Sequence, residues 1–208
     1  MSARLHPAAP VPRRDAPAGG WLYARSRKLP GSLGALVLIA LGVRWADRQL
    51  DVRTALALLA PLAAASVVGT SLHGYADGLD RTAARAWWPR RLAHVTLLSA
   101  VAALLLAVAV HGPPQEYGTA VLARNTLGTA GVATLSAVLL GARLSWLPPL
   151  VWLCGLHLVA PSDGGRVWDA VTWPVSQAER GGAWVTAVAL FLVGAVVHAR
   201  WGVRARQT

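Results

Sequence analysis

The sequence is poor in charged residues and in cysteine, and both shortages limit what the chain can be. Charged residues make up 14% of its 208 residues, whereas soluble domains carry roughly 25%. Much of the surface must therefore face something other than water. Cys154 is the only cysteine, which excludes a disulfide within the sequence and any multi-cysteine zinc or iron–sulfur site. We interpret Cys154 as a small apolar residue inside a membrane span.

Catalytic motifs are also missing. The sequence contains no G-x-x-x-x-G-K-[ST] phosphate loop, no H-E-x-x-H zinc motif and no G-x-S-x-G nucleophile motif. These absences exclude a P-loop ATP site, a zinc site of the H-E-x-x-H type for hydrolysis, and a serine nucleophile of the G-x-S-x-G type for acyl transfer. Its apolar runs hold no paired Asp or Glu of the kind that proton-coupled pumps use. We therefore expect no catalytic residue, no metal site and no cofactor bound by the chain itself, and no enzyme activity.

Apolar residues are abundant, at 55% of the chain, and they gather in long runs. A bilayer core of ~30 Å requires about 17–25 such residues per helix. The runs predict an all-α polytopic membrane protein with six transmembrane helices, within a membrane domain over 21–208 that follows a disordered cytoplasmic tail over 1–20. The predicted spans are Gly31–Trp45, Thr54–His73, Leu92–His111, Thr119–Gly141, Leu144–Ala160 and Ala183–Trp201.

Basic residues predict the orientation. The formal net charge is +11, but the arginines cluster at the ends of apolar runs instead of forming the stripe that binds nucleic acid. With the N-terminus inside, fourteen basic residues fall on the cytoplasmic side and five outside, as the positive-inside rule requires. Both termini are thus expected in the cytoplasm, in a multi-pass protein of the inner (plasma) membrane. The tryptophans fall mostly at the two predicted interfaces, and only Trp152 lies well inside a span.

The predicted cytoplasmic loop 74–91 holds a short basic helix. Asp77 can cap a helix over residues 78–88, and Pro89 is expected to end it. Two interpretations fit: a docking element for a cytoplasmic partner, or a basic loop that touches anionic lipid. The residues assigned to docking are Asp80, Arg81, Arg85, Trp87 and Trp88.

Polar residues interrupt the fourth span. Arg124 and Asn125 lie about one and a half turns into it, where an arginine costs a few kcal/mol unless it pairs, reaches the interface or faces water. They line a substrate path, together with Thr126 and His157, or else Arg124 reaches outward to Glu116 or to headgroups. Further along, Thr129, Ala133, Ala137 and Gly141 form a stripe of small residues that predicts a helix–helix interface, within the chain or between protomers.

Two other features bear on function. The outer segment that contains Trp168 and Trp173 is long enough for a short amphipathic or re-entrant piece at the interface. Histidines near span ends can in principle ligate haem from two helices, which leaves a haem- or quinone-binding subunit as an alternative. These histidines are His73, His94, His111, His157 and His198.

This layout resembles a type-2 permease of ATP-binding-cassette (ABC) exporters. The segments GLDRTAARAWWPRRLAH, ARNTLGTAG and GARLSWLPPLVW resemble small actinobacterial six-helix membrane subunits, over roughly residue 21 to the end. In that family the segment between the second and third spans is a coupling helix, which Asp80, Arg81 and Arg85 match. WLYARSRK, over residues 21–28, is a short and weakly apolar match to the family's amphipathic helix before the first span.

The resemblance implies a mechanical role and several partners. A separate cytoplasmic ABC ATPase would bind ATP and push on the coupling helix, and a second permease subunit, identical or different, would complete the path. Membrane lipids surround the subunit and no nucleic acid is involved. The substrate cannot be inferred. A non-transport membrane scaffold or accessory subunit with the same layout remains the main alternative, and the haem or quinone protein the lesser one.

Overall fold

The computed structural model describes residues 29–50, 53–72, 88–110, 118–158, 170–176 and 181–203, and in these segments every regular element is helical. Their elements are α2 (Leu29–Gln49), α3 (Arg53–Ser71), α5 (Trp88–Ala109), α6 (Thr119–Leu140), the 3-10 turn η1 (Ala142–Leu144), α7 (Leu147–Leu158), the 3-10 turn η2 (Trp173–Val175) and α9 (Gly181–Trp201). The predicted tail 1–20 lies outside the described residues.

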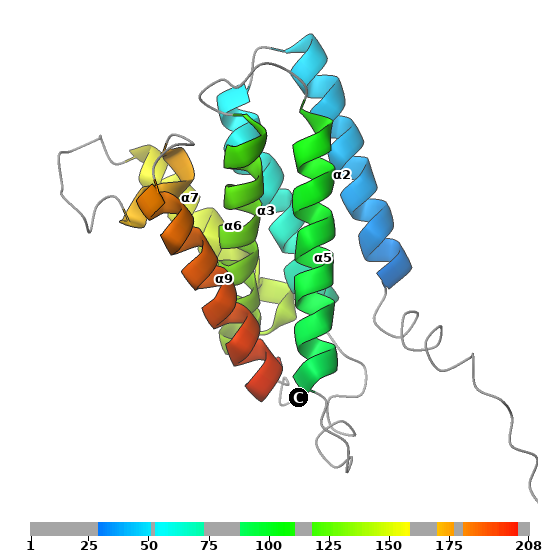
Figure 1. Cartoon of the computed structure of the whole chain (residues 1–208), viewed down its shortest axis with the longest axis vertical. Helices are drawn as coiled ribbons and strands as arrows, with labels where there is room; N and C mark the ends of the chain where they lie inside the picture. The colour runs from blue at the N-terminus through cyan, green and yellow to red at the C-terminus, as the bar shows by residue number, and fades with distance from the viewer. Residues whose placement is uncertain are drawn as a thin grey trace, which may run out of the picture.

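The helices run alternately up and down, with α6 in the middle of the bundle (Figure 1). It packs against α3, α5 and α9, while α2 and α7 lie at the periphery. The start of α2 and the end of α9 lie at the same end of the bundle, below in Figure 1, which we call the lower end. A cluster of buried apolar residues joins the lower ends of α3, α5, α6 and α9, and its members are Leu72, Val95, Ala137, Ala142, Ala195 and Val203.

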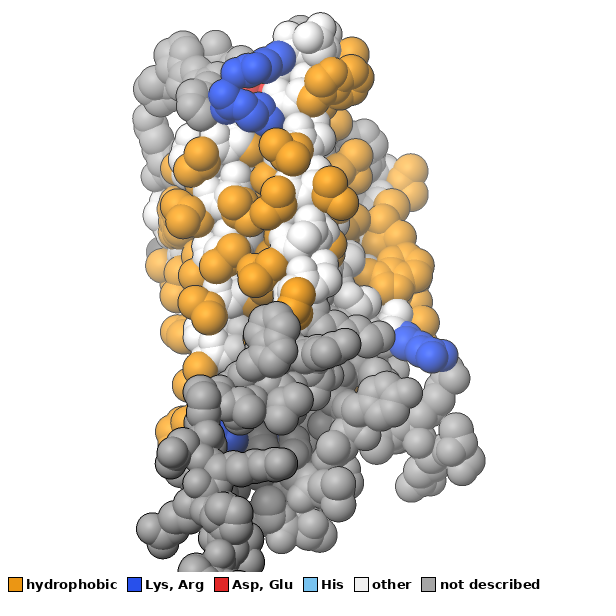
Figure 2. All heavy atoms as spheres, turned by 90° about the vertical axis from the view of Figure 1, so that its right-hand side faces the viewer, with side chains coloured by type: hydrophobic (Ala, Val, Ile, Leu, Met, Phe, Trp, Pro, Cys, Tyr) orange, Lys and Arg blue, Asp and Glu red, His pale blue; other side chains and the backbone are white. Residues whose placement is uncertain are grey.

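Four helices are long and apolar enough to cross a membrane: α2, α3 from Thr54 onward, α5 and α9. Their outward faces carry large apolar side chains, such as Leu38, Leu97 and Val185, each about 70% exposed. Figure 2 shows such side chains along the middle of the described surface, with basic side chains toward its ends. Surfaces of this kind suit lipid, because water would not solvate a contiguous apolar face of this size.

Two of the six predicted spans correspond to helices that are not among these four, α6 and α7. α6 has 22 residues, but it is not among the four because polar side chains and glycines interrupt it. α7 has 12 residues, a rise of about 18 Å, against the ~30 Å of a bilayer core. α7 begins three residues after the start of the predicted span Leu144–Ala160, because Gly141 ends α6 and the chain turns through η1 first. Residues 159–160 of that span lie outside the described residues.

Pro89 does not end a helix, contrary to the prediction. α5 begins at Trp88, so Pro89 lies in its first turn. A proline is tolerated there because the first N–H groups of a helix have no partner inside it. Trp88 therefore belongs to α5. The rest of the predicted docking helix, with Asp80, Arg81, Arg85 and Trp87, lies outside the described residues.

Small residues on two faces of α6 allow its neighbours to approach closely. Thr129 and Ala133, from the predicted stripe, face α3 of the same chain, where Thr129 Oγ1 lies 3.3 Å from Pro61 O. On another face, Gly131 meets Gly194 of α9 so closely that a Cβ on Gly131 would lie 2.5 Å from the Phe191 backbone. Both contacts bring backbones together as small residues do in membrane helices.

Candidate functional site

The polar residues of the fourth predicted span are buried. Arg124, Asn125 and Thr126 lie in the second turn of α6 and are at most 1% exposed. Thr126 donates to Leu122 O in its own helix at 2.7 Å. Arg124 and Asn125 instead make hydrogen bonds to segments far away in the sequence, so their partners define the site.

Asn125 replaces a hydrogen-bond donor that α3 lacks. Pro61 lies inside α3, and because proline has no N–H, the carbonyl of Ala57, four residues earlier, receives no bond from its own helix. Asn125 Nδ2 donates to that oxygen at 2.9 Å. A buried carbonyl without a donor costs about 1–3 kcal/mol, so this side chain of α6 compensates for a break in α3.

The same two side chains hold the segment between α7 and α9. Asn125 Nδ2 also donates to Pro174 O at 2.8 Å, and Arg124 Nη2 donates to Ser176 O at 2.7 Å. Arg124 Nε lies 3.2 Å from Asn125 Oδ1 and donates to it. The Asn125 amide thus uses both of its protons and its oxygen. We call Arg124, Asn125 and the three carbonyls of Ala57, Pro174 and Ser176 the polar clasp.

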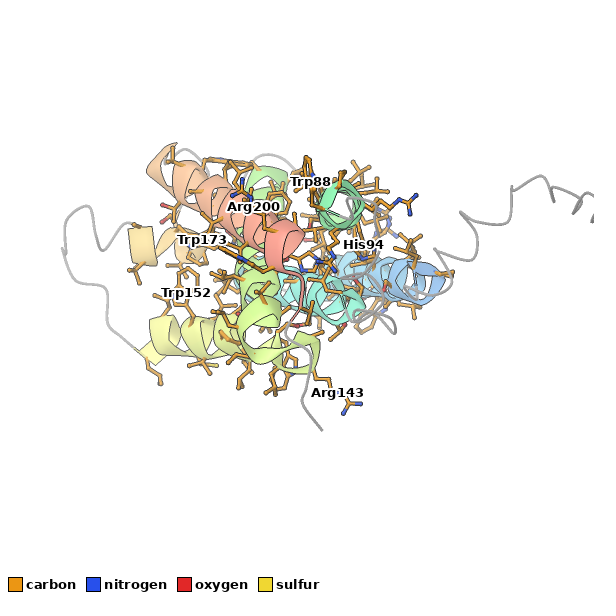
Figure 3. The ribbon with its side chains drawn as sticks, turned by 90° about the horizontal axis from the view of Figure 1, so that it is seen from below. Trp88, His94, Arg143, Trp152, Trp173 and Arg200 are labelled. Carbon is orange, nitrogen blue, oxygen red and sulfur yellow. The ribbon has the colours of Figure 1, made fainter. Side chains whose placement is uncertain are left out.

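Trp173 seats the 3-10 turn η2 against α6. Its side chain is fully buried, and its ring occupies the space that a Cβ on Gly128 would need. Trp152 of α7 meets it edge to face, with ring centroids 5.7 Å apart, and Figure 3 shows the two rings between α7 and α9. The indole Nε1 has no acceptor among the described residues, so packing holds the ring in place.

The location of Trp173 corrects a prediction. Its position in the outer segment suggested the membrane interface, where an indole N–H stays wet. The structure buries it instead because Gly128 leaves a notch on α6 and the clasp pulls η2 inward. The signal in the sequence was Gly128, four residues after Arg124, which puts both on one face of the helix.

The clasp can fix structure, but it offers little to a substrate. Its two side chains are buried and hydrogen-bonded to the chain itself. The described residues around Arg124 thus enclose it. Glu116, its suggested partner in the other interpretation, lies outside the described residues. His157 lies in α7, and the structure does not describe its side chain.

Other candidate residues lie apart from the clasp. Ala137 belongs to the lower apolar cluster, and Gly141, with a positive φ of 91°, ends α6, as a glycine does most easily. His94 and His198 are buried, and His94 Nε2 lies 3.1 Å from Ser71 Oγ. No three His, Cys, Asp or Glu side chains in the described segments lie close enough to hold a metal ion. Trp88 is 55% exposed at the lower end.

Comparison with known proteins identified no relative of this chain. No protein-family model, no curated protein and no solved structure matches the chain.

Proposed function

We propose that the chain is the membrane-spanning permease subunit of an ABC exporter, with six spans, both termini in the cytoplasm, and a separate ATPase docked on residues 74–91. The main support is where that connection begins and ends. α3 ends and α5 begins at the lower end, beside the C-terminal end of α9. The connection over residues 73–87 therefore begins and ends at the lower end of the bundle, where α2 also starts and α9 also ends.

The proposed substrate path runs between two subunits. Inside one chain the central helix is closely packed on α3 and α9, and its buried polar side chains are hydrogen-bonded internally. A path that opens and closes must be lined by surfaces that separate, and the outward helix faces of one chain supply half of such a lining. A homodimer or a pair of related permeases completes it.

Association with an ATPase tests the proposal. The protein is expressed in its source cells, solubilised in mild detergent and purified. ATP hydrolysis by the purified sample is then measured, and any co-purified ATPase is identified by mass spectrometry. Arg81→Glu with Arg85→Glu should abolish this activity. Arg143→Glu with Arg200→Glu is the matched control, because both side chains are exposed at the same end, and it should retain the activity.

A second candidate is a non-transport membrane subunit that stabilises a partner complex. The polar clasp favours it, because Arg124 and Asn125 serve a structural role and line no polar path among the described residues of one chain. If an ATPase accompanies the protein but its hydrolysis rate does not respond to candidate substrates in proteoliposomes, this role replaces the first. If no ATPase accompanies it, the docking proposal fails altogether.

A further inference from the structure

A hydrogen bond joins the last residue of α3 to the second turn of α5 at the lower end of the bundle. Ser71 Oγ and His94 Nε2 lie 3.1 Å apart, and the two residues are 5% and 9% exposed. Figure 3, seen from below, labels His94 inside the bundle between α5 and α3. The bond is therefore shielded from water, which would otherwise compete for both groups.

The direction of this bond follows from the second contact of the serine. Ser71 Oγ lies 2.6 Å from Val68 O, in its own helix. Two oxygens approach this closely only with a proton between them, so the single hydroxyl proton of Ser71 goes to the carbonyl. Ser71 must then accept from His94, whose Nε2 carries a proton. One imidazole N–H of α5 thus binds the end of α3.

Ser71 differs from the other hydroxyl residues in the lower part of α3. Ser66 and Thr70 donate to backbone oxygens of α3 itself, whereas Ser71 also bonds to a neighbouring helix. Beside this bond, Leu72 and Val95 pack in one buried apolar cluster. A directional bond and an apolar contact together hold the end of α3 against α5.

The bond closes the base of the connection between α3 and α5. It joins residues 23 positions apart in sequence, and residues 73–87 run between them. Holding both ends of a segment reduces the number of conformations that a partner must restrict on binding. Because both bonded groups are buried, they act on that binding through position and not through contact with the partner.

We propose that the hydrogen bond from His94 to Ser71 sets the spacing between the two ends of the connection 73–87, and thereby favours docking of the ATPase on it. His94 is in this sense a positioning residue. The inference rests on the proposed function for what docks, but the spacing itself can be measured without any partner.

Spin labels measure the spacing in the full-length protein in mild detergent. In a Cys154→Ser background, Thr70→Cys and Leu97→Cys place nitroxides on exposed positions of α3 and α5, and the dipolar coupling between them gives the distribution of separations. His94→Ala should lower the ratio of the wild-type separation to longer ones about fivefold, the effect of one buried hydrogen bond. His94→Gln, which keeps a side-chain N–H donor, should retain the wild-type distribution.

Two further comparisons separate the bond from general destabilisation. Thr96→Ala on the same helix is the matched control, because Thr96 donates to backbone oxygens of α5 itself, and it should leave the distribution unchanged. Ser71→Ala should lower the ratio as His94→Ala does, and the two together should lower it no further. An unchanged distribution in His94→Ala, or additive effects of the two alanines, would overturn the proposal.

Retention of the ATPase tests the consequence for docking. The ATPase that co-purifies with each variant is quantified: His94→Ala should retain about fivefold less than the wild type, and His94→Gln should retain the wild-type amount. A changed distribution of separations with full retention would refute the role in docking. If no ATPase accompanies the wild type, the permease proposal fails, and the spin labels alone decide whether His94 sets the spacing.

Discussion

At the residue scale, Asn125 joins three elements of the described bundle, α6, α3 and η2. Its amide links α6 to α3 and to η2 through two backbone carbonyls, and it receives a hydrogen bond from Arg124. Each of these oxygens is buried, so none has water as a substitute. Asn125 therefore contributes to stability mainly because its loss would leave buried carbonyls without a donor, and less through the net energy of the hydrogen bonds themselves.

Asn125→Ala is expected to destabilise the protein by about 2–6 kcal/mol, since two buried carbonyls each lose a donor at about 1–3 kcal/mol. The free energy of unfolding is measured by titration of the protein from mild detergent into SDS, with helicity as the signal. Thr70→Ala is the control, because Thr70 is exposed and bonds only within its own helix. A change below 1 kcal/mol for Asn125→Ala would show that the clasp does not hold the fold.

Pro61→Ala should reduce the importance of Asn125. An alanine at this position supplies an N–H to the Ala57 carbonyl, so the oxygen that Asn125 satisfies gains a donor within α3. In a double-mutant cycle, Asn125→Ala should then cost about 1 kcal/mol less in the Pro61→Ala background than in the wild type. Strictly additive free energies of unfolding would contradict the idea that Asn125 compensates for Pro61.

At the scale of elements, the sequence predicted helices well and their contacts poorly. The bounds of α6 and α9 agree with the predicted Thr119–Gly141 and Ala183–Trp201 within two residues, because apolar composition and polar flanks decide where a span lies. The clasp could not be predicted, because it joins residues about 50 and 68 positions apart in sequence. No local pattern pairs an orphaned carbonyl in one helix with an amide in another.

Close contact between α6 and α9 gives a prediction for these elements. A Cβ on Gly194 would collide with the Gly131 carbonyl, so Gly194→Ala should separate the helices and cost about 1–3 kcal/mol, the usual range for overpacking. Gly34→Ala on α2 is the matched control, because a Cβ there meets nothing within 4 Å and alanine favours helix. The free energy of unfolding of both variants is measured by the same SDS titration. Equal changes for Gly194→Ala and Gly34→Ala would show that the close contact between Gly131 and Gly194 has no special importance for stability.

At the scale of the whole molecule, the number of spans decides on which side each connection lies. Four helices satisfy length and composition for crossing, and with these alone residues 110–180 would lie on one side of the membrane. With six spans, α6 and α7 cross as well, and the turn between them, with Arg143, returns to the lower end. Both topologies place the two chain ends on the same side, so reporters at the termini cannot distinguish them.

Labelling at Arg143 distinguishes the two topologies. In a Cys154→Ser background, Arg143→Cys and Arg200→Cys each carry one exposed thiol, and a membrane-impermeant maleimide is applied to intact cells and to inverted vesicles. With six spans, both thiols react only in inverted vesicles, because both positions lie at the lower, cytoplasmic end. Because Arg124 is buried with its partners inside the bundle, α6 can cross at the few-kcal/mol cost of one arginine. Reaction at Arg143→Cys in intact cells would leave α6 and α7 outside the set of spanning helices, and with them the six-span permease.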